Sequence, residues 1–187
     1  MIRRVTETKV LSQAYNRIFK SLNPFSPAVQ IEVPVRRVLY PTYGYHLDAN
    51  QYQALTKALI DCGEKEFYIS ILEYERKYNG PFTEGDHWVC ELSNYLEYAE
   101  LPIVLENALY STNGMWGILI SHELHALLAC HPRFWEAFRK YYPNWKQDQD
   151  RFVEEWKYNH NTYGSDISWL HDFLDSLTDT MQGKTDE

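Results

Sequence analysis

Apolar residues recur at helical spacing in the first part of the chain. Between residues 5 and 22 they fall on one side of a helix, with arginine and lysine available for the other side. This pattern predicts an amphipathic helix within residues 1–22. The proline-containing run at 23–27 ends it, and residues 23–35 are expected to form a connector, with residues 29–35 as a candidate edge strand.

The next segments alternate between strand and helix patterns. A strand is expected around residues 37–43. The following helix begins after Asp48, which can cap it together with Gln51, and ends at Gly63, which can adopt a left-handed conformation. Residues 67–73 are rich in β-favouring side chains and predict a core strand.

An irregular stretch is expected after that strand. It opens with a turn at Asn79-Gly80-Pro81 and contains a short helix near residues 94–101.

The clearest strand pattern lies between residues 103 and 130. Two apolar runs, 103–110 and 115–120, are separated by a turn that contains Asn113 and Gly114, a strong hairpin signal because both residues tolerate positive φ. A third run, 124–130, is expected to complete a three-stranded meander through a turn at Ser121-His122-Glu123.

Helical periodicity returns after the meander. Helices are expected from Pro132 to Pro143, at 147–159 and at 165–177, the last capped by Ser165, and a frayed polar tail at 178–187. With 187 residues, the chain is predicted to be a single α+β domain over residues 1–187. Its small, mainly antiparallel sheet would be covered by N-terminal and C-terminal helices.

Composition narrows the class of protein. The chain has 44% hydrophobic and 24% charged residues, which is typical of a folded globular protein. Its three cysteines, Cys62, Cys90 and Cys130, include no Cys-x-x-Cys pair, so no disulfide framework is expected. No signal-peptide pattern and no long apolar run occurs, so a cytoplasmic location without membrane association is expected.

Charge is unevenly distributed along the chain, whose net charge is −8. Residues 1–40 carry seven Lys or Arg against two Glu. No basic residue lies between Lys77 and Arg133, where seven acidic residues occur. Such a stretch would repel nucleic acid and anionic membranes and attract a basic protein. The alternative is an acidic face that only keeps the protein in solution.

Tyrosines within the acidic stretch indicate a binding surface. Tyrosine buries a large area in an interface and keeps a polar group, and Tyr95 and Tyr98 are expected to be exposed among glutamates. The alternative is an ordinary solvated helix. The predicted partner-binding residues are Glu84, Asp86, Glu91, Tyr95, Glu97, Tyr98 and Glu100.

The segment His122-Glu123-Leu124-His125 invites comparison with the His-Glu-x-x-His zinc motif. Its histidines are three residues apart and not four, so the motif is broken, and His131 is a third ligand only on a different backbone geometry. A polar turn beside a strand is favoured over a metal site. Ser121 lacks the Gly-x-Ser-x-Gly elbow and Cys130 is expected to be a buried thiol, so no catalytic residue and no cofactor are predicted.

Residues 109–121 and 125–128, together with the helix at 169–174, resemble segments of uncharacterised small bacterial proteins. Some of those proteins look like immunity proteins of toxin systems. The resemblance implies a cytosolic inhibitor that covers a basic toxin or nuclease with an acidic surface, and it carries over no catalytic residue. The leading hypothesis is therefore a protein-binding module. The alternatives are a metal-dependent enzyme that uses His122, Glu123 and His125, and a structural subunit that forms a homo-oligomer through its aromatic helices.

Overall fold

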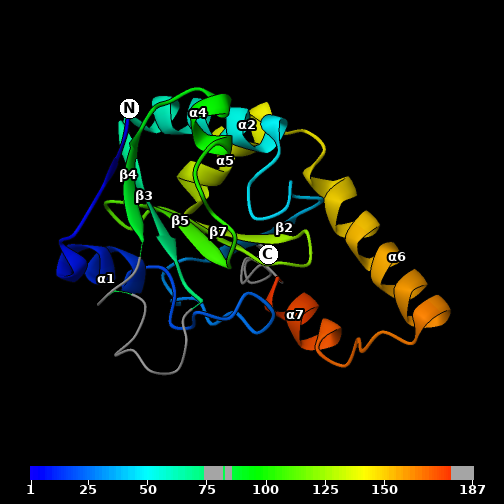
Figure 1. The fold of residues 1–187 in the computed structure, drawn as a ribbon. Helices are drawn as coiled ribbons and strands as arrows, with labels where there is room; N and C mark the ends of the chain where they lie inside the picture. Colours follow the sequence, from blue (N-terminus) through cyan, green and yellow to red (C-terminus); the bar gives the residue numbers. More distant parts are fainter. Residues whose placement is uncertain (74–81, 83–85, 178–187) are drawn as a thin grey trace.

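The computed structural model describes residues 1–73, 82 and 86–177. Seven strands form one antiparallel sheet in the order β1-β4-β3-β5-β6-β7-β2, and the described residues also contain six helices, so the fold class is α+β as expected (Figure 1). The strands are β1 (Ile2–Arg4), β2 (Val35–Leu39), β3 (Glu66–Ile71), β4 (His87–Glu91), β5 (Asn107–Ser111), β6 (Trp116–Ile120) and β7 (Ala126–Cys130). The helices are α1 (Thr8–Asn16), α2 (Ala49–Cys62), α4 (Tyr95–Ala99), α5 (Pro132–Tyr141), α6 (Trp145–Tyr163) and α7 (Leu170–Ser176).

The meander β5-β6-β7 forms the centre of the sheet, and its prediction is confirmed. Every residue of these three strands is buried, which explains why they read as continuous apolar runs. In the β5–β6 turn, the Asn113 side-chain oxygen accepts a hydrogen bond from the Met115 amide (3.1 Å), and Gly114 has a φ of 85°. A methyl group at Gly117 would lie 2.5 Å from the Phe19 ring, so this position requires glycine.

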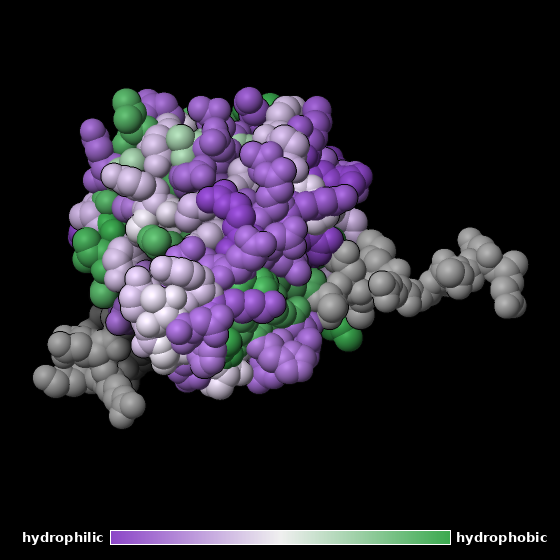
Figure 2. All heavy atoms as spheres, turned by 90° about the vertical axis from the view of Figure 1, so that its right-hand side faces the viewer, coloured by the Kyte–Doolittle hydropathy of each residue, from purple (hydrophilic) through white to green (hydrophobic). Residues whose placement is uncertain are grey.

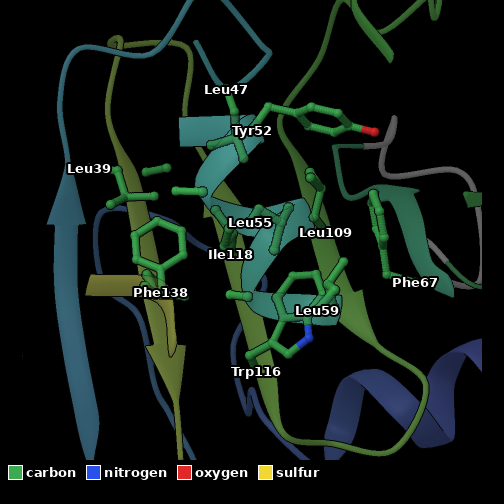
Figure 3. Packing of buried hydrophobic residues seen from close by; sticks show 14 of the residues in the cluster. Leu39, Leu47, Tyr52, Leu55, Leu59, Phe67, Leu109, Trp116, Ile118 and Phe138 are labelled. Carbon is green, nitrogen blue, oxygen red and sulfur yellow. The ribbon is translucent and has the colours of Figure 1, made fainter. Parts of the chain in front are cut away.

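One face of the sheet is covered by α2, α4 and α5 (Figure 1). The Asp48–Gln51 capping box and the left-handed Gly63, at a φ of 78°, bound α2 as predicted. Side chains of α2, including Tyr52 and Leu55, point towards the strands and fill this core (Figure 3).

The opposite face is covered by α1 and α7, and α6 lies beside β2 (Figure 1). The expected first helix is shorter than predicted, because the chain leaves α1 after Asn16. Ile18 and Phe19 still enter the core, where Phe19 forms a bridge with Val29. The side of the molecule that carries α6 is largely hydrophilic, with a restricted hydrophobic patch (Figure 2).

Two strands were not expected. β1 is an edge strand that pairs with β4, and β4 lies in the stretch that was predicted to be irregular. β2 begins at Val35, earlier than predicted, and forms the other edge of the sheet.

The C-terminal helices also differ from the prediction. Ser165 does not cap the last helix, because Gly164 ends α6 in a left-handed conformation and the Asp166 side chain then accepts a hydrogen bond from the Ser168 amide (2.8 Å). The predicted turn at 79–81 and tail at 178–187 lie outside the described residues. No helix of the described part is both long and apolar enough to cross a membrane.

Candidate protein-binding surface

Helix α4 is fixed to the protein by Tyr98. The expectation that Tyr98 is exposed is wrong, since its side chain has no solvent-accessible surface. Its ring stacks on Tyr52 with the ring centroids 4.4 Å apart, and its hydroxyl oxygen accepts a hydrogen bond from the Leu47 amide (2.9 Å). Burial is favourable because this hydrogen bond satisfies the one polar atom of the side chain. Tyr98 therefore positions α4 and is not a contact residue.

Other residues of α4 point outward. Leu96 is 71% exposed, and Glu97 and Glu100 are also exposed. The Asn94 side chain caps the helix by accepting a hydrogen bond from the Glu97 amide (3.0 Å). An apolar side chain therefore projects into solvent beside two carboxylates.

Two further tyrosines complete this surface, one of them the first residue of α4. Tyr95 is half-buried, and its hydroxyl donates a hydrogen bond to the Leu47 carbonyl oxygen (3.3 Å). Burial raises the pKa of Tyr95. Tyr43 forms a bridge with His46, whose ring centroid lies 5.2 Å from that of Tyr98. Tyr43 is 70% exposed. The name α4 surface is used below for these residues together: Tyr43, Tyr95, Leu96, Glu97 and Glu100.

The carboxylates of the α4 surface have no cationic partner among the residues that the structure describes. Within the described ranges, neither Glu97 nor Glu100 forms an ion pair, and the Glu97 carboxylate accepts a hydrogen bond only from the Asn94 amide group (3.3 Å). Their negative charge is therefore directed to solvent, where it attracts cations over about a Debye length of 8–10 Å.

The acidic residues at the two ends of β4 have a different environment. Asp86 pairs with Arg4 (3.0 Å) and Glu91 with the amino group of Met1 (3.9 Å), because β1 lies antiparallel beside β4. Asp86 and Glu91 are also five residues apart along an extended chain, about 16 Å. Folding thus brings the basic N-terminus against part of the acidic stretch. Glu84 lies outside the described residues.

The histidines of the broken zinc motif lie on a turn and a strand. Residues 121–130 form a turn and a strand, so the helix that an i, i+3 chelate requires is not present. His125 is fully buried, and its Nδ1 is hydrogen-bonded to the Ser121 hydroxyl (2.9 Å), whereas His131 lies at the far end of β7, about 20 Å along the chain. Across the described residues, no group of three His, Cys, Asp or Glu side chains is arranged to hold a metal.

Two buried carboxyl groups serve the fold. Asp148 accepts hydrogen bonds from the Tyr142 hydroxyl (2.7 Å) and the Tyr40 amide (3.0 Å), and Glu64 accepts one from the Trp116 indole (3.3 Å). Burial raises the pKa of both groups. Each links a helix or its end to a neighbouring strand, which is a structural role.

A second surface feature escaped sequence reasoning. A groove of about 420 Å³ is lined by aromatic and polar residues from three distant segments of the chain. The lining residues are irregularly spaced along the sequence, so no local motif predicts the groove. The groove is called the aromatic groove below, and its lining residues are Phe25, His122, Glu123, Trp156, Asn159, Ser165, Asp166 and Trp169.

A scan against models of protein families, a search of curated proteins and a search of solved structures each returned no match. The resemblance to immunity proteins of toxin systems stays a prediction.

Proposed function

We propose that this protein is a protein-binding module and that its α4 surface contacts a basic protein. The observation that carries the proposal is the exposed Leu96 beside two carboxylates, Glu97 and Glu100, neither of which forms an ion pair among the described residues. Single exposed leucines are common on protein surfaces. Here the leucine is on a helix that Tyr98 holds rigidly, so a partner would meet a preorganised surface.

The charges and the apolar groups would act at different stages of binding. Carboxylates attract a basic partner over distance and speed association. Leu96 and Tyr43 lose water only in the complex, so they slow dissociation. Neither stage requires a catalytic residue or a cofactor.

The finer form of the proposal is an immunity protein that covers a basic toxin or nuclease. The negative charge of the α4 surface supports this form of the proposal. A nuclease that binds anionic nucleic acid presents cationic groups at its active site, and these would attract the carboxylates. The basic N-terminus does not oppose this reading, since Arg4 is already paired with Asp86 in the sheet. The homo-oligomer alternative would need another surface, because two α4 surfaces repel one another.

Affinity capture from the native host tests the proposal. Wild-type protein is compared with Glu97→Lys/Glu100→Lys and with Glu154→Lys/Glu155→Lys, which makes the same charge change at exposed positions of α6. We expect wild type and the α6 variant to retain a stoichiometric basic protein that added salt releases, and the α4 variant to lose it. Equal capture by both variants, or wild-type protein recovered alone, would contradict the proposal.

Elemental analysis of protein purified without chelators tests the enzyme alternative separately. Stoichiometric zinc, manganese or iron would support a metal-dependent enzyme. Sub-stoichiometric amounts of all three would argue against it.

A further inference from the structure

Three aromatic rings line the aromatic groove, and the Trp169 ring is perpendicular to the other two. The rings of Trp156 and Trp169 are 5.0 Å apart at 89°, and those of Phe25 and Trp169 are 5.1 Å apart at 88°. Trp169 is half-buried, and its indole donates a hydrogen bond to the Asp166 carbonyl oxygen (3.1 Å). These contacts fix the rings before any ligand arrives.

Buried aromatic residues support the groove from below. His125 packs against Phe25 and Trp169 with ring centroids 5.2 and 5.9 Å apart, and Phe152 lies 5.0 Å from His125. The groove therefore has a rigid base that belongs to the core. Binding of a ligand would therefore cost little conformational entropy in these side chains.

The rim of the groove is acidic. Glu123 and Asp166 line it, and Glu106 lies just behind, 2.8 Å from His122. Hydrogen bonds from Ser168 keep the pKa of Asp166 below its usual value, so this group is ionised at neutral pH. The His122 ring also lies beside the rim, with its Nε2 atom 3.4 Å from the Glu123 carboxylate.

We infer that the aromatic groove binds the guanidinium group of an arginine side chain presented by a partner protein. Aromatic faces attract cations through their quadrupole, and carboxylates complete the site. A planar guanidinium can stack on a ring and donate to two carboxylates at once, which a lysine ammonium does less well. The volume of about 420 Å³ accommodates one such side chain and part of its backbone.

The inference does not depend on the α4 surface. The two sites involve different residues and can be disabled separately. Binding in the groove needs only a partner protein with an accessible arginine side chain.

Nuclear magnetic resonance of the indole N–H groups tests the inference on the full chain, which contains six tryptophans. The probe is the tripeptide acetyl-Gly-Arg-Gly-amide, titrated into the millimolar range. Matched tripeptides carry citrulline, the uncharged isostere of arginine, or lysine. Trp156→Phe and Trp169→Phe assign the two groove signals. We expect the arginine peptide to shift these two signals selectively and to bind at least about tenfold more tightly than the citrulline peptide.

Substitutions at the rim then test the charges. Glu123→Gln together with Asp166→Asn retains side-chain oxygens, including an acceptor for Ser168, and should weaken arginine binding about five- to tenfold. Glu97→Gln/Glu100→Gln on the α4 surface should leave it unchanged. The inference would be overturned if the citrulline or the lysine peptide bound as tightly as the arginine peptide. Shifts confined to the other four indoles would overturn it as well.

Discussion

The α4 surface and the aromatic groove both combine carboxylates with aromatic rings, yet they are built differently. The α4 surface comes mainly from one short helix, and its most exposed apolar group is Leu96. The aromatic groove is recessed and is assembled from segments around Phe25, Glu123 and Trp169. A projecting surface suits a broad protein partner, whereas a recessed groove suits one side chain.

The two regions also differ in how they are held in place. Tyr98 anchors α4 through one stacked ring and one hydrogen bond. The groove rests on a cluster of aromatic residues that includes Phe152, Phe173 and the buried His125. The α4 surface should therefore be sensitive to single substitutions of its anchor, and the groove to changes of its buried base.

Substitution of the α4 anchor should have the largest effect. Tyr98→Ala leaves a cavity against Tyr52 and should lower the free energy of unfolding by about 3–5 kcal/mol. Tyr98→Phe keeps the ring but leaves the Leu47 amide without its acceptor, so a loss of about 1–3 kcal/mol is expected. Urea denaturation measures both. If the two variants were equally stable, the stacked ring would not be what holds α4.

The base of the groove should respond to pH. Burial lowers the pKa of His125 to about 4, so between pH 6.5 and 4 the unfolded chain binds a proton that the folded protein does not. This group therefore removes stability as pH falls, by about 2 kcal/mol between pH 7 and pH 5. Asp148 and Glu64 act in the opposite direction, because a raised carboxyl pKa favours the folded state at low pH.

Comparison with His125→Gln isolates the histidine contribution. Glutamine does not titrate and can still pair with Ser121, so the stability advantage of wild type over the variant should shrink by that amount between pH 7 and pH 5. Urea denaturation at the two pH values measures the difference. A constant advantage would show that His125 accepts a proton in the folded protein.

Charge reversal on the α4 surface should slow association. Glu97→Lys/Glu100→Lys should lower the association rate constant for a basic partner about tenfold at low salt, with little change in dissociation. Added salt should reduce the difference. Stopped-flow or surface-based kinetics measure it, and Glu154→Lys/Glu155→Lys provides the matched control. Equal slowing in both variants would mean that only total charge matters.

Truncation of the projecting leucine should have the smallest effect. Leu96→Ala should change the free energy of unfolding by less than about 0.5 kcal/mol, because the side chain is mostly in solvent. In the complex it should raise the dissociation rate about fivefold, equivalent to about 1 kcal/mol. An unchanged dissociation rate would remove Leu96 from the interface.

Local signals predicted much of the fold. The capping pair Asp48 and Gln51 with Gly63 defined α2, and the turn at Asn113 and Gly114 defined the central hairpin, because these features depend on neighbours in sequence. β1 was missed because its three residues are mostly polar and its partner, β4, is some 85 positions away along the chain.

The candidate site was only partly predictable for the same reason. A five-residue helix is too short for periodicity to assign a buried side, so Tyr98 could not be separated from Tyr95 by sequence. Pairing of Asp86 with Arg4 depends on the register of β1. The groove depends on the packing of segments between Phe25 and Trp169. Such long-range contacts cannot be predicted from the spacing of residue types along the sequence.

Hydrogen exchange of the protein alone and bound to its captured basic partner tests the central claim most directly. Binding through the α4 surface predicts slower exchange of backbone amides in residues 94–101, with little change at residues 145–163 on α6. Unchanged exchange at 94–101 with protection elsewhere would contradict the claim that the α4 surface is the binding site.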